Sequence, residues 1–393
     1  MKRLMIVGAS VLQLPAILKS KEMGLSVAVV DFNPQAVGIP YADKYYNVST
    51  MDEDAVLAAA EDYKPDGIMT LATDMPMRGV AKTSEKLHLH SINYVTAVKA
   101  TDKSAMIKAF KEYDVPSPWY FDVESFDDLK ALEDKVTFPC IMKPTDNAGS
   151  HGVAKVNSFE ELLANYEYSH SCSRHGEVIV EEYLDGPEVS VEVMVVDGKV
   201  NILQITDKIT TGAPHFVEMG HTQPSRLPYE TQQQIKKVAE MACKSIGIDK
   251  GPAHVEMKVT NRGPVMIELG ARMGGDNITT HLVPLSTGID MVGSTIKVAM
   301  GEQPDIEPTL HCGSAIRYFE EPLGTIKAIE GVEAAKQIPG VKQITFTKEV
   351  GEESTPIHCS NDRIGFVIAQ GATSEDAVMA CEKAIKTINI RIN

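Results

Sequence analysis

The segment spanning residues 251–277 constrains the fold of this chain more than any other part of the sequence. It contains two short runs typical of strands, AHVEMK and PVMIEL, separated by Asn261-Arg262-Gly263. Glycine is the residue expected at the left-handed position of a three-residue hairpin loop. The segment therefore predicts an antiparallel hairpin.

Two acidic residues of this hairpin are predicted to face each other. If Thr260 lies opposite Pro264, then Glu256 lies directly opposite Glu268. Cross-strand carboxylates in this relation are about 5 Å apart and repel each other. Hard cations such as Mg²⁺ are held by one or two carboxylates together with substrate phosphates. The pair therefore predicts a metal site that holds a nucleotide.

Composition narrows the class of protein. The 393 residues are enough for two or three domains, and 43% of them are hydrophobic, as in ordinary globular proteins. A net charge of −16 argues against general nucleic-acid binding, which needs a basic surface. The six cysteines show no CxxC spacing, and no run of about 20 apolar residues is present. We expect a cytoplasmic protein with reduced thiols and no contact with membranes.

The first 101 residues alternate strand and helix signals. Apolar runs at 4–7, 26–30 and 67–73 read as buried strands, with a helix at 12–23 between the first two. This order predicts βαβ units and a parallel sheet. Only Gly8 of a GxGxxG pattern is present, so NAD binding is not favoured.

A second unit is predicted from residue 102 to 310 and a third from 311 to 393. The second opens with a helix at 102–113. EVSVEVMVV at 188–196 alternates with period two, as a half-buried antiparallel strand does. The third unit has strands at SAIRYF and RIGFVIAQG and ends in an amphipathic helix.

A small, flexible loop follows a strand in CIMKPTDNAGSHGVAKV. The strand delivers Lys143, and Gly149, Ser150 and Gly152 follow it. Backbone N–H groups, a hydroxyl and an ammonium suit phosphate binding. The alternative is a plain hairpin with a glycine-rich turn. The loop is not a Walker A motif, because Lys143 precedes the glycines.

The segment VIVEEYLDGPEVSVEV carries a weaker signal. Residues from Glu181 to Leu184 form an extended stretch whose backbone can read an adenine edge, and Glu188 can accept hydrogen bonds from ribose hydroxyls. In isolation, a solvated acidic turn explains the same residues.

Taken in chain order, four motifs resemble the ATP-grasp superfamily. They are TDKSAMIKAF, IMKPTDNAGSHGV, IVEEYLDGPEVSVEV and AHVEMK…MIELGAR. Similar order and spacing occur in biotin carboxylase, D-alanine–D-alanine ligase and the L-amino-acid (dipeptide) ligases. The resemblance implies an α/β protein with α+β character in the ATP-binding part. It also implies a lid at about 115–183 within the second unit.

The resemblance also implies residue roles. It places Lys103, Lys143 and Ser150 on the phosphates of ATP, and Glu181 and Leu184 at adenine. Glu188 is expected at the ribose. By the same likeness Glu256 and Glu268 hold Mg²⁺, with Mn²⁺ as an alternative ion. Arg272 and Lys143 are the expected catalytic residues, because both supply positive charge to a reaction that gathers negative charge.

Two positions depart from the family pattern. Gly270 stands where biotin carboxylase has an asparagine that serves as a further metal ligand, and small residues there resemble the L-amino-acid ligase branch. His151 stands where a basic Arg or Lys is common. A solvated loop histidine is the simpler interpretation of His151.

The substrate side is predicted from residues 208–228. The pattern PHFVE-x-GHT-x-P resembles the substrate loop of L-amino-acid ligases and implies that Glu218 and His221 face the active site together with Arg272. A structural loop histidine is the alternative for His221. Arg317 in AIRYF is a further candidate, from its likeness to a catalytic arginine of biotin carboxylase. His254 and Lys258 share the Glu256 face by strand alternation.

These observations predict an ATP-dependent carboxylate–amine ligase acting on a small carboxylate, such as an amino acid, and an amine. One alternative keeps the fold but uses bicarbonate or formate, as biotin carboxylase and the purine-synthesis transformylase do. Another is a nucleotide-binding regulatory protein without catalysis. Family members are often dimers, so a homodimer stays open.

Overall fold

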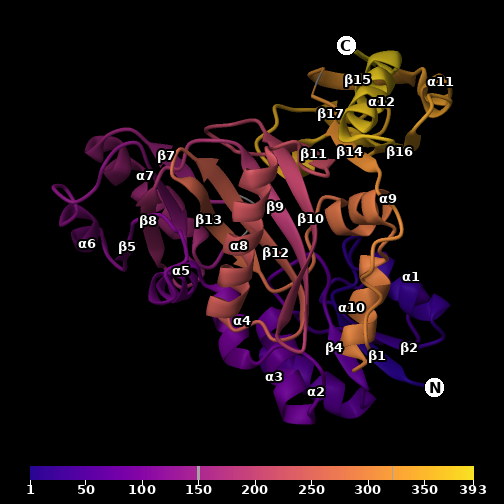
Figure 1. Ribbon diagram of the computed structural model, residues 1–393, viewed down its shortest axis with the longest axis horizontal. Coiled ribbons are helices and arrows are strands. Elements are labelled where there is room, and N and C mark those ends of the chain that lie inside the picture. Colours follow the sequence, from indigo (N-terminus) through magenta and orange to yellow (C-terminus); the bar gives the residue numbers. More distant parts are fainter. Residues whose placement is uncertain (148–150, 321) are drawn as a thin grey trace.

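Four parallel strands form the N-terminal sheet (Figure 1). The computed structural model describes residues 1–147, 151–320 and 322–393. The strand order is β3-β2-β1-β4, with bounds β1 Arg3–Val7, β2 Ser26–Val30, β3 Lys44–Tyr46 and β4 Gly67–Met69. The helices of this region are α1 Leu14–Glu22, α2 Glu53–Tyr63, α3 Met77–Leu87 and α4 Tyr94–Thr101. The predicted βαβ arrangement is confirmed.

Both faces of this sheet are buried, as its uninterrupted apolar strands require. Leu4 packs on one side in a cluster with Ile17 of α1 and Ile296, while Met5 packs on the other side with Val56 of α2. Ile296 belongs to α10 (Met291–Ala299), which is distant in sequence yet lies beside β1 in Figure 1. The domain boundaries at residues 101 and 310 stay predictions.

An antiparallel sheet of eight strands runs through the centre of the protein. Its order is β13-β12-β9-β10-β11-β14-β18-β16. The strand bounds are β9 Glu188–Val196, β10 Lys199–Thr210, β11 Glu218–Gln223, β12 Gly251–Thr260, β13 Gly263–Gly270, β14 Gly313–Tyr318, β16 Val341–Phe346 and β18 Gly365–Gly371. Helix α8 (Tyr229–Ile246) packs on one face through its apolar stripe.

Strand β9 shows why the sequence alternates with period two. Val189, Val191 and Val193 pack in the same apolar cluster as α8. The side chains between them, which include Ser190 and Glu192, point to the other face and are also buried. The prediction of an antiparallel strand is therefore confirmed, but the prediction of half-burial is wrong, because the second face is also covered: Met194 on that face packs in the cluster that contains Leu4 and Ile296.

A smaller antiparallel sheet, on the left of Figure 1, lies within the segment predicted as the lid and is called the lid sheet below. Its order is β5-β8-β6-β7, with bounds β5 Tyr120–Val123, β6 Cys140–Pro144, β7 Ala154–Val156 and β8 Val178–Glu182. Helices α6 (Phe126–Lys130) and α7 (Phe159–Cys172) accompany it. Ser158 caps α7, because its hydroxyl oxygen accepts a hydrogen bond from Glu161 N.

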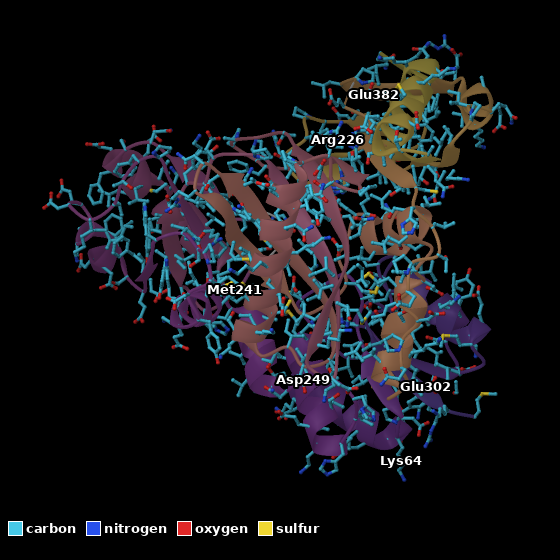
Figure 2. The ribbon with its side chains drawn as sticks, in the orientation of Figure 1. Lys64, Arg226, Met241, Asp249, Glu302 and Glu382 are labelled. Atoms are coloured by element: carbon cyan, nitrogen blue, oxygen red, sulfur yellow. The ribbon has the colours of Figure 1, made fainter. Side chains whose placement is uncertain are left out.

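The C-terminal elements close the far end of the large sheet. Helix α12 (Ser374–Thr387) packs with β14 and β18, and a three-stranded sheet of order β17-β15-β19 lies beyond. Figure 2 labels Glu382 on α12 and Arg226 beyond β11, where these elements meet the large sheet. The remaining bounds are α5 Lys103–Glu112, the π-helix η2 Ile278–Leu282, α9 Val283–Thr287, β15 Gly324–Glu330, α11 Val332–Lys336, β17 Glu353–Ser354, β19 Asn389–Ile392 and the 3₁₀ turns η1 Ile39–Tyr41 and η3 Ser360–Asp362. The predicted mixed α/β fold class is confirmed.

Candidate active site

The face of the large sheet opposite α8 is polar although it is largely buried. Strand pairing places Lys208 of β10 and Lys258 of β12 on either side of Glu188. The next polar positions on β9, Ser190 and Glu192, have no exposed surface. Buried charges cost free energy unless they are paired. Such a concentration of them is more typical of a functional site than of a core.

The two hairpin glutamates face each other, but through a register that differs from the prediction. Thr260 pairs with Gly263 and not with Pro264, so the loop has two residues, and Gly263 adopts a positive φ of 96°. A β-bulge after Glu256 then shifts the ladder by one residue and brings Glu256 opposite Glu268. The predicted pair is confirmed, whereas the predicted register and loop length are wrong.

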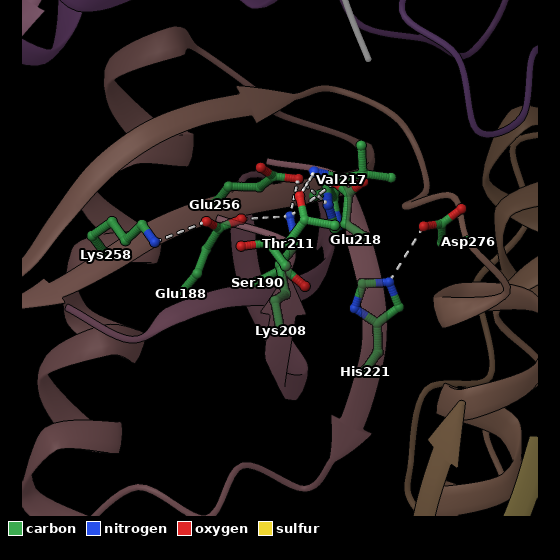
Figure 3. Close-up of polar contacts among 12 residues, drawn as sticks. Glu188, Ser190, Lys208, Thr211, Val217, Glu218, His221, Glu256, Lys258 and Asp276 are labelled. Atoms are coloured by element: carbon green, nitrogen blue, oxygen red, sulfur yellow. Dashed lines mark hydrogen bonds and ion pairs between the residues drawn. The ribbon is translucent and has the colours of Figure 1, made fainter. Parts of the chain in front are cut away.

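Glu256 is held by two cationic neighbours (Figure 3). Lys208 Nζ lies 3.1 Å from Glu256 Oε1 and 2.9 Å from Glu188 Oε1, and His254 Nε2 lies 2.9 Å from Glu256 Oε1. Burial raises the pKa of Glu256, but Lys208 and His254 outweigh it and keep the pKa well below its usual range. Burial lowers the pKa of His254, yet Glu192 and Glu256 raise it to about 9. The pair is thus ionised as His254⁺ and Glu256⁻ at neutral pH.

Two lysines supply charge on the other side of the carboxylate pair. Lys103, at the first position of α5, lies 3.1 Å from Glu268 Oε2 and donates to Asn147 O at 2.8 Å. Lys143 on β6 forms a buried ion pair of 2.7 Å with Glu181 on β8. Burial raises the pKa of Glu268, but Lys103 outweighs it, so the pKa is lowered. Each buried lysine is matched by a carboxylate.

A cleft between the lid sheet and the large sheet brings most of the predicted residues together. The sequence-predicted residues that line this cleft are Lys103, Lys143, Glu181, Leu184, Glu188, Glu218, Glu256 and Glu268, together with His151 and Lys258. Ile141, Leu184 and Met266 give it apolar walls. Tyr183 and Leu184 make no backbone–backbone hydrogen bonds within the described part of the chain, so their backbone groups are available at the cleft. Ser150 lies outside the described residues.

Arg272 does not line the cleft that brings the other predicted residues together; it is bound instead to Asp74 of the N-terminal region. Its Nε and Nη2 donate to the two carboxylate oxygens of Asp74 at 2.9 and 2.8 Å. A Cβ added at Gly270 would lie 2.7 Å from Asp74 Oδ1 and 3.0 Å from Arg272 Cζ. The ion pair between Arg272 and Asp74 therefore requires glycine at position 270, because any side chain there would collide with it.

His221 was predicted to face the active site together with Glu218, but it lies outside the cleft. It has no exposed surface, does not line the cleft, and its Nε2 lies 3.4 Å from Asp276 Oδ2 (Figure 3). Arg363 donates to both oxygens of Asp276, at 2.8 and 2.9 Å, and packs over the Tyr318 ring at 3.8 Å. Burial raises the pKa of Asp276, but Arg363 and His221 lower it further than burial raises it.

Arg317 is likewise turned away from the cleft. Its guanidinium donates to His221 O, Ile316 O and Thr222 Oγ1 at 2.8 to 3.0 Å. Burial lowers the pKa of this guanidinium. These contacts tie neighbouring strands together, so the geometry gives no support to a catalytic role for Arg317.

Four residues that matter to the geometry were not predicted. They are Asp74, Lys208, Asp276 and Arg363. A signal for Lys208 existed, because it is a lysine at the start of the segment that also contains Glu218. Asp74 and Arg363 carried no local signal, because their partners lie 198 and 87 residues away along the chain.

The described residues carry few features of other kinds of site. In the ranges that the structure describes, no group of three or more His, Cys, Asp or Glu side chains is arranged to hold a metal ion by itself. No helix in those ranges is both long and apolar enough to cross a membrane. All six cysteines are free of disulfide bonds.

Comparison with known proteins identifies two regions of the chain. Residues 136–281 match the ATP-grasp domain, and residues 317–393 match the L-amino acid ligase C-terminal domain 2. The first region contains the carboxylate pair, strands β6 to β8 of the smaller sheet and strands β9 to β13 of the large sheet. The second contains Arg317 and Arg363.

Relatives extend this likeness over the chain. Alanine–anticapsin ligase of Bacillus subtilis (strain 168) is 27% identical over 316 residues, which cover 74% of this chain and 66% of the ligase. The formate-dependent phosphoribosylglycinamide formyltransferase of Saccharolobus solfataricus is 22% identical and covers 99% of this chain and 97% of its own. The crystal structure of L-amino acid ligase from Bacillus licheniformis superposes with a TM-score of 0.85 at 24% identity, covering 100% of this chain and 99% of that one.

Proposed function

Because the chain is a member of the ATP-grasp ligases, we propose that it uses ATP to join a small carboxylate to an amine. In the first step a carboxylate oxygen attacks the γ-phosphorus, forming an acyl phosphate and releasing ADP. In the second step the amine nitrogen attacks the acyl carbon. The C–N bond forms, the C–O bond to phosphate breaks, phosphate leaves with the electron pair, and the nitrogen loses a proton. The carboxylate is proposed to be an amino acid.

One observation carries the proposal. Glu256 and Glu268 face each other in a cleft that is also lined by Lys103 and Lys143. Two lysines and a carboxylate pair are the complement of a triphosphate with a divalent cation. The free backbone of Tyr183 and Leu184 lies in the same cleft, where an adenine edge would bind.

The donor set fits Mg²⁺. Glu256 and Glu268 offer carboxylate oxygens on facing strands and would hold the ion, while Gly270 offers no side-chain ligand, so further oxygen ligands would come from phosphate and water. The bound ion supplies charge neutralisation and Lewis acidity at the phosphates. Lys208 and His254 fix the Glu256 carboxylate, and Lys103 fixes that of Glu268. Mn²⁺ fits the same oxygen donors.

The remaining residues are assigned by position. Lys143, together with Ser150, contacts the phosphates, and Glu188 contacts the ribose once it exchanges one of its two lysine partners. Arg272, held by Asp74, stabilises the oxyanion of the tetrahedral intermediate. Glu218 lines the cleft and receives the ammonium of the carboxylate substrate. His221, which is fully buried, has a structural role in the same strand, β11.

A second candidate keeps the fold and uses formate. The full-length match to the formate-dependent formyltransferase favours it, because that match covers 99% of this chain. The match of residues 317–393 to the L-amino acid ligase C-terminal domain 2 weighs against it. We therefore rank the amino-acid ligase first.

The proposal is tested by phosphate release from ATP across a matrix of amino acids, with Mg²⁺ present. Release that requires both an acid and an amine, with a product mass equal to their sum minus water, supports it. Release with formate and glycinamide ribonucleotide, but with no amino-acid pair, would favour the transformylase. No release with any acid would contradict both.

A further inference from the structure

A second cleft adjoins the nucleotide cleft. The two share Lys103, Asn147 and Glu268, which form the wall between them. One side of the second cleft is built by N-terminal residues, which include Asp74 and Arg78, and the other by lid residues, which include Arg174. A ligand held there would lie next to the carboxylate pair without occupying the nucleotide cleft.

The acidic side chains in this cleft are already engaged. Asp74 accepts both hydrogen bonds from Arg272. Asp146 accepts hydrogen bonds from Ser173 Oγ and from the backbone N–H of Arg174 at 3.0 to 3.1 Å. Glu268 is paired with Lys103 as described above. Glu53 accepts a hydrogen bond from the Tyr94 hydroxyl at 3.0 Å and lies 3.6 Å from Lys82 Nζ. Each carboxylate that lines this cleft among the described residues therefore already has a partner.

Arg78 and Arg174, in contrast to these carboxylates, are not paired with a group of opposite charge among the described residues. Arg78 Nε donates to Thr101 Oγ1 at 2.7 Å, and Arg174 Nη2 contacts Met75 Sδ at 2.6 Å, a weak acceptor. Across the described ranges, neither guanidinium pairs with a carboxylate. By contrast, Arg262, which is more than half exposed, pairs with Glu182 at 2.7 Å. Two guanidinium groups on facing walls of one cleft are therefore left with donors to spare.

We propose that the second cleft binds the anionic group of the amine substrate, with Arg78 and Arg174 as its receptors. A guanidinium donates in a planar fork that matches a carboxylate or a phosphate. The proposal rests on the proposed ligase function and narrows it. The amine is an amino acid or an aminoalkyl phosphate and not a neutral amine. Anchoring its anionic end on Arg78 and Arg174 leaves its nitrogen toward Glu268, where the acyl phosphate forms.

Binding measured without turnover tests this inference separately from the ligase function. The protein is saturated with a non-hydrolysable ATP analogue and Mg²⁺ and titrated calorimetrically with L-alanine, O-phosphoethanolamine and the neutral L-alaninamide. We expect at least one anionic probe to bind and the amide to bind at least tenfold more weakly. Comparison of alanine with phosphoethanolamine tells whether the anion is a carboxylate or a phosphate.

The variants are Arg78→Gln and Arg174→Gln, with Arg391→Gln as control, because Arg391 is exposed and pairs with Glu330 on the distant β15–β19 sheet. Each cleft variant is expected to raise the Kd of the anionic probe at least tenfold and to leave the Kd of the ATP analogue within twofold of wild type. The inference is overturned if neither anionic probe binds the wild type, or if both bind the cleft variants as tightly as the control. Loss of the ligase function appears instead as the absence of acid-dependent phosphate release.

Discussion

The nucleotide cleft and the second cleft share a wall, but they differ in whether their cationic side chains are paired with carboxylates. Lys103 and Lys143, which line the nucleotide cleft, and Lys208, which is buried beside its glutamates, are each paired with carboxylates at 2.7 to 3.1 Å. In the second cleft Arg78 and Arg174 pair with none among the described residues. Paired buried charges set the shape of a site before its ligand arrives. Unpaired charged side chains on the wall of an open cleft can instead pair with a charge on the ligand.

Removing one carboxylate from the pair Glu256 and Glu268 should cause the largest loss of activity. Glu268→Gln keeps the shape but removes the charge that Lys103 and the proposed Mg²⁺ share. We expect kcat to fall by about 10³-fold or more, measured by phosphate release at saturating ATP. Glu330→Gln, an exposed residue of an ion pair on β15, is the control and should keep wild-type turnover. Normal activity of Glu268→Gln would disprove the metal assignment.

Lys208 tests whether pairing stabilises the fold as well as the site. Its side chain is 2% exposed and touches Glu188 and Glu256. Lys208→Met leaves these carboxylates less compensated, so the free energy of unfolding should fall by about 3 kcal/mol. Urea unfolding measures it. Lys244→Met, which breaks an exposed pair with Glu240, should change it by less than about 0.5 kcal/mol. Equal effects of the two variants would refute the distinction.

Position 270 tests the link between the N-terminal wall and Arg272. The Cβ of Gly270→Ala would displace Asp74 or Arg272, and displacement of a catalytic group by about 1 Å costs on the order of 10²-fold in rate. We expect kcat to fall by about that factor with the KM for ATP little changed. Gly275→Ala adds a methyl group to open space and should be neutral. An active Gly270→Ala variant would show that the Asp74 contact is dispensable.

The Asp276–Arg363 pair, outside both clefts, predicts a dependence on pH. The folded-state pKa of Asp276 lies below its unfolded value of about 4. Its contribution to stability is therefore complete above about pH 4 and is lost as pH falls below that value. Asp276→Asn should lower the free energy of unfolding by about 1–3 kcal/mol at pH 7. The gap to wild type should narrow as urea unfolding is repeated toward pH 3; a constant gap would contradict the assignment.

The smallest effect is expected for the unpaired arginine. Within the described residues, the guanidinium of Arg174 makes one side-chain hydrogen bond, to a thioether, so Arg174→Gln should leave the free energy of unfolding within about 0.5 kcal/mol of wild type. Urea unfolding in the absence of ligand measures it. A loss comparable to that of Lys208→Met would mean that Arg174 is a structural residue and not a ligand receptor.

The sequence predicted what depends on local patterns. The three strands and the first helix predicted in residues 1–101 are found in the structure, although β3 and helices α2 to α4 were not predicted. The facing of Glu256 and Glu268 and the convergence of Lys103, Lys143 and Glu188 on one cleft are also found. Periodicity and motif spacing encode these features. The β-bulge after Glu256 was missed, because alternation alone does not reveal an extra residue in a ladder.

The rest depended on contacts that are distant in sequence. Asp74 meets Arg272 across 198 positions, and Arg363 meets Asp276 across 87. His221 and Glu218 lie close in the sequence, but only Glu218 reaches the cleft. Such relations follow from how sheets pack against each other, which no local pattern records.

The central claim is that a carboxylate is activated by transfer of the γ-phosphoryl group. It is tested most directly by supplying the acid with both carboxylate oxygens labelled with ¹⁸O and analysing the released phosphate by mass spectrometry. Attack of one carboxylate oxygen on phosphorus, followed by displacement by the amine, leaves one ¹⁸O atom in each phosphate. Phosphate without label, formed in step with product, would contradict the account.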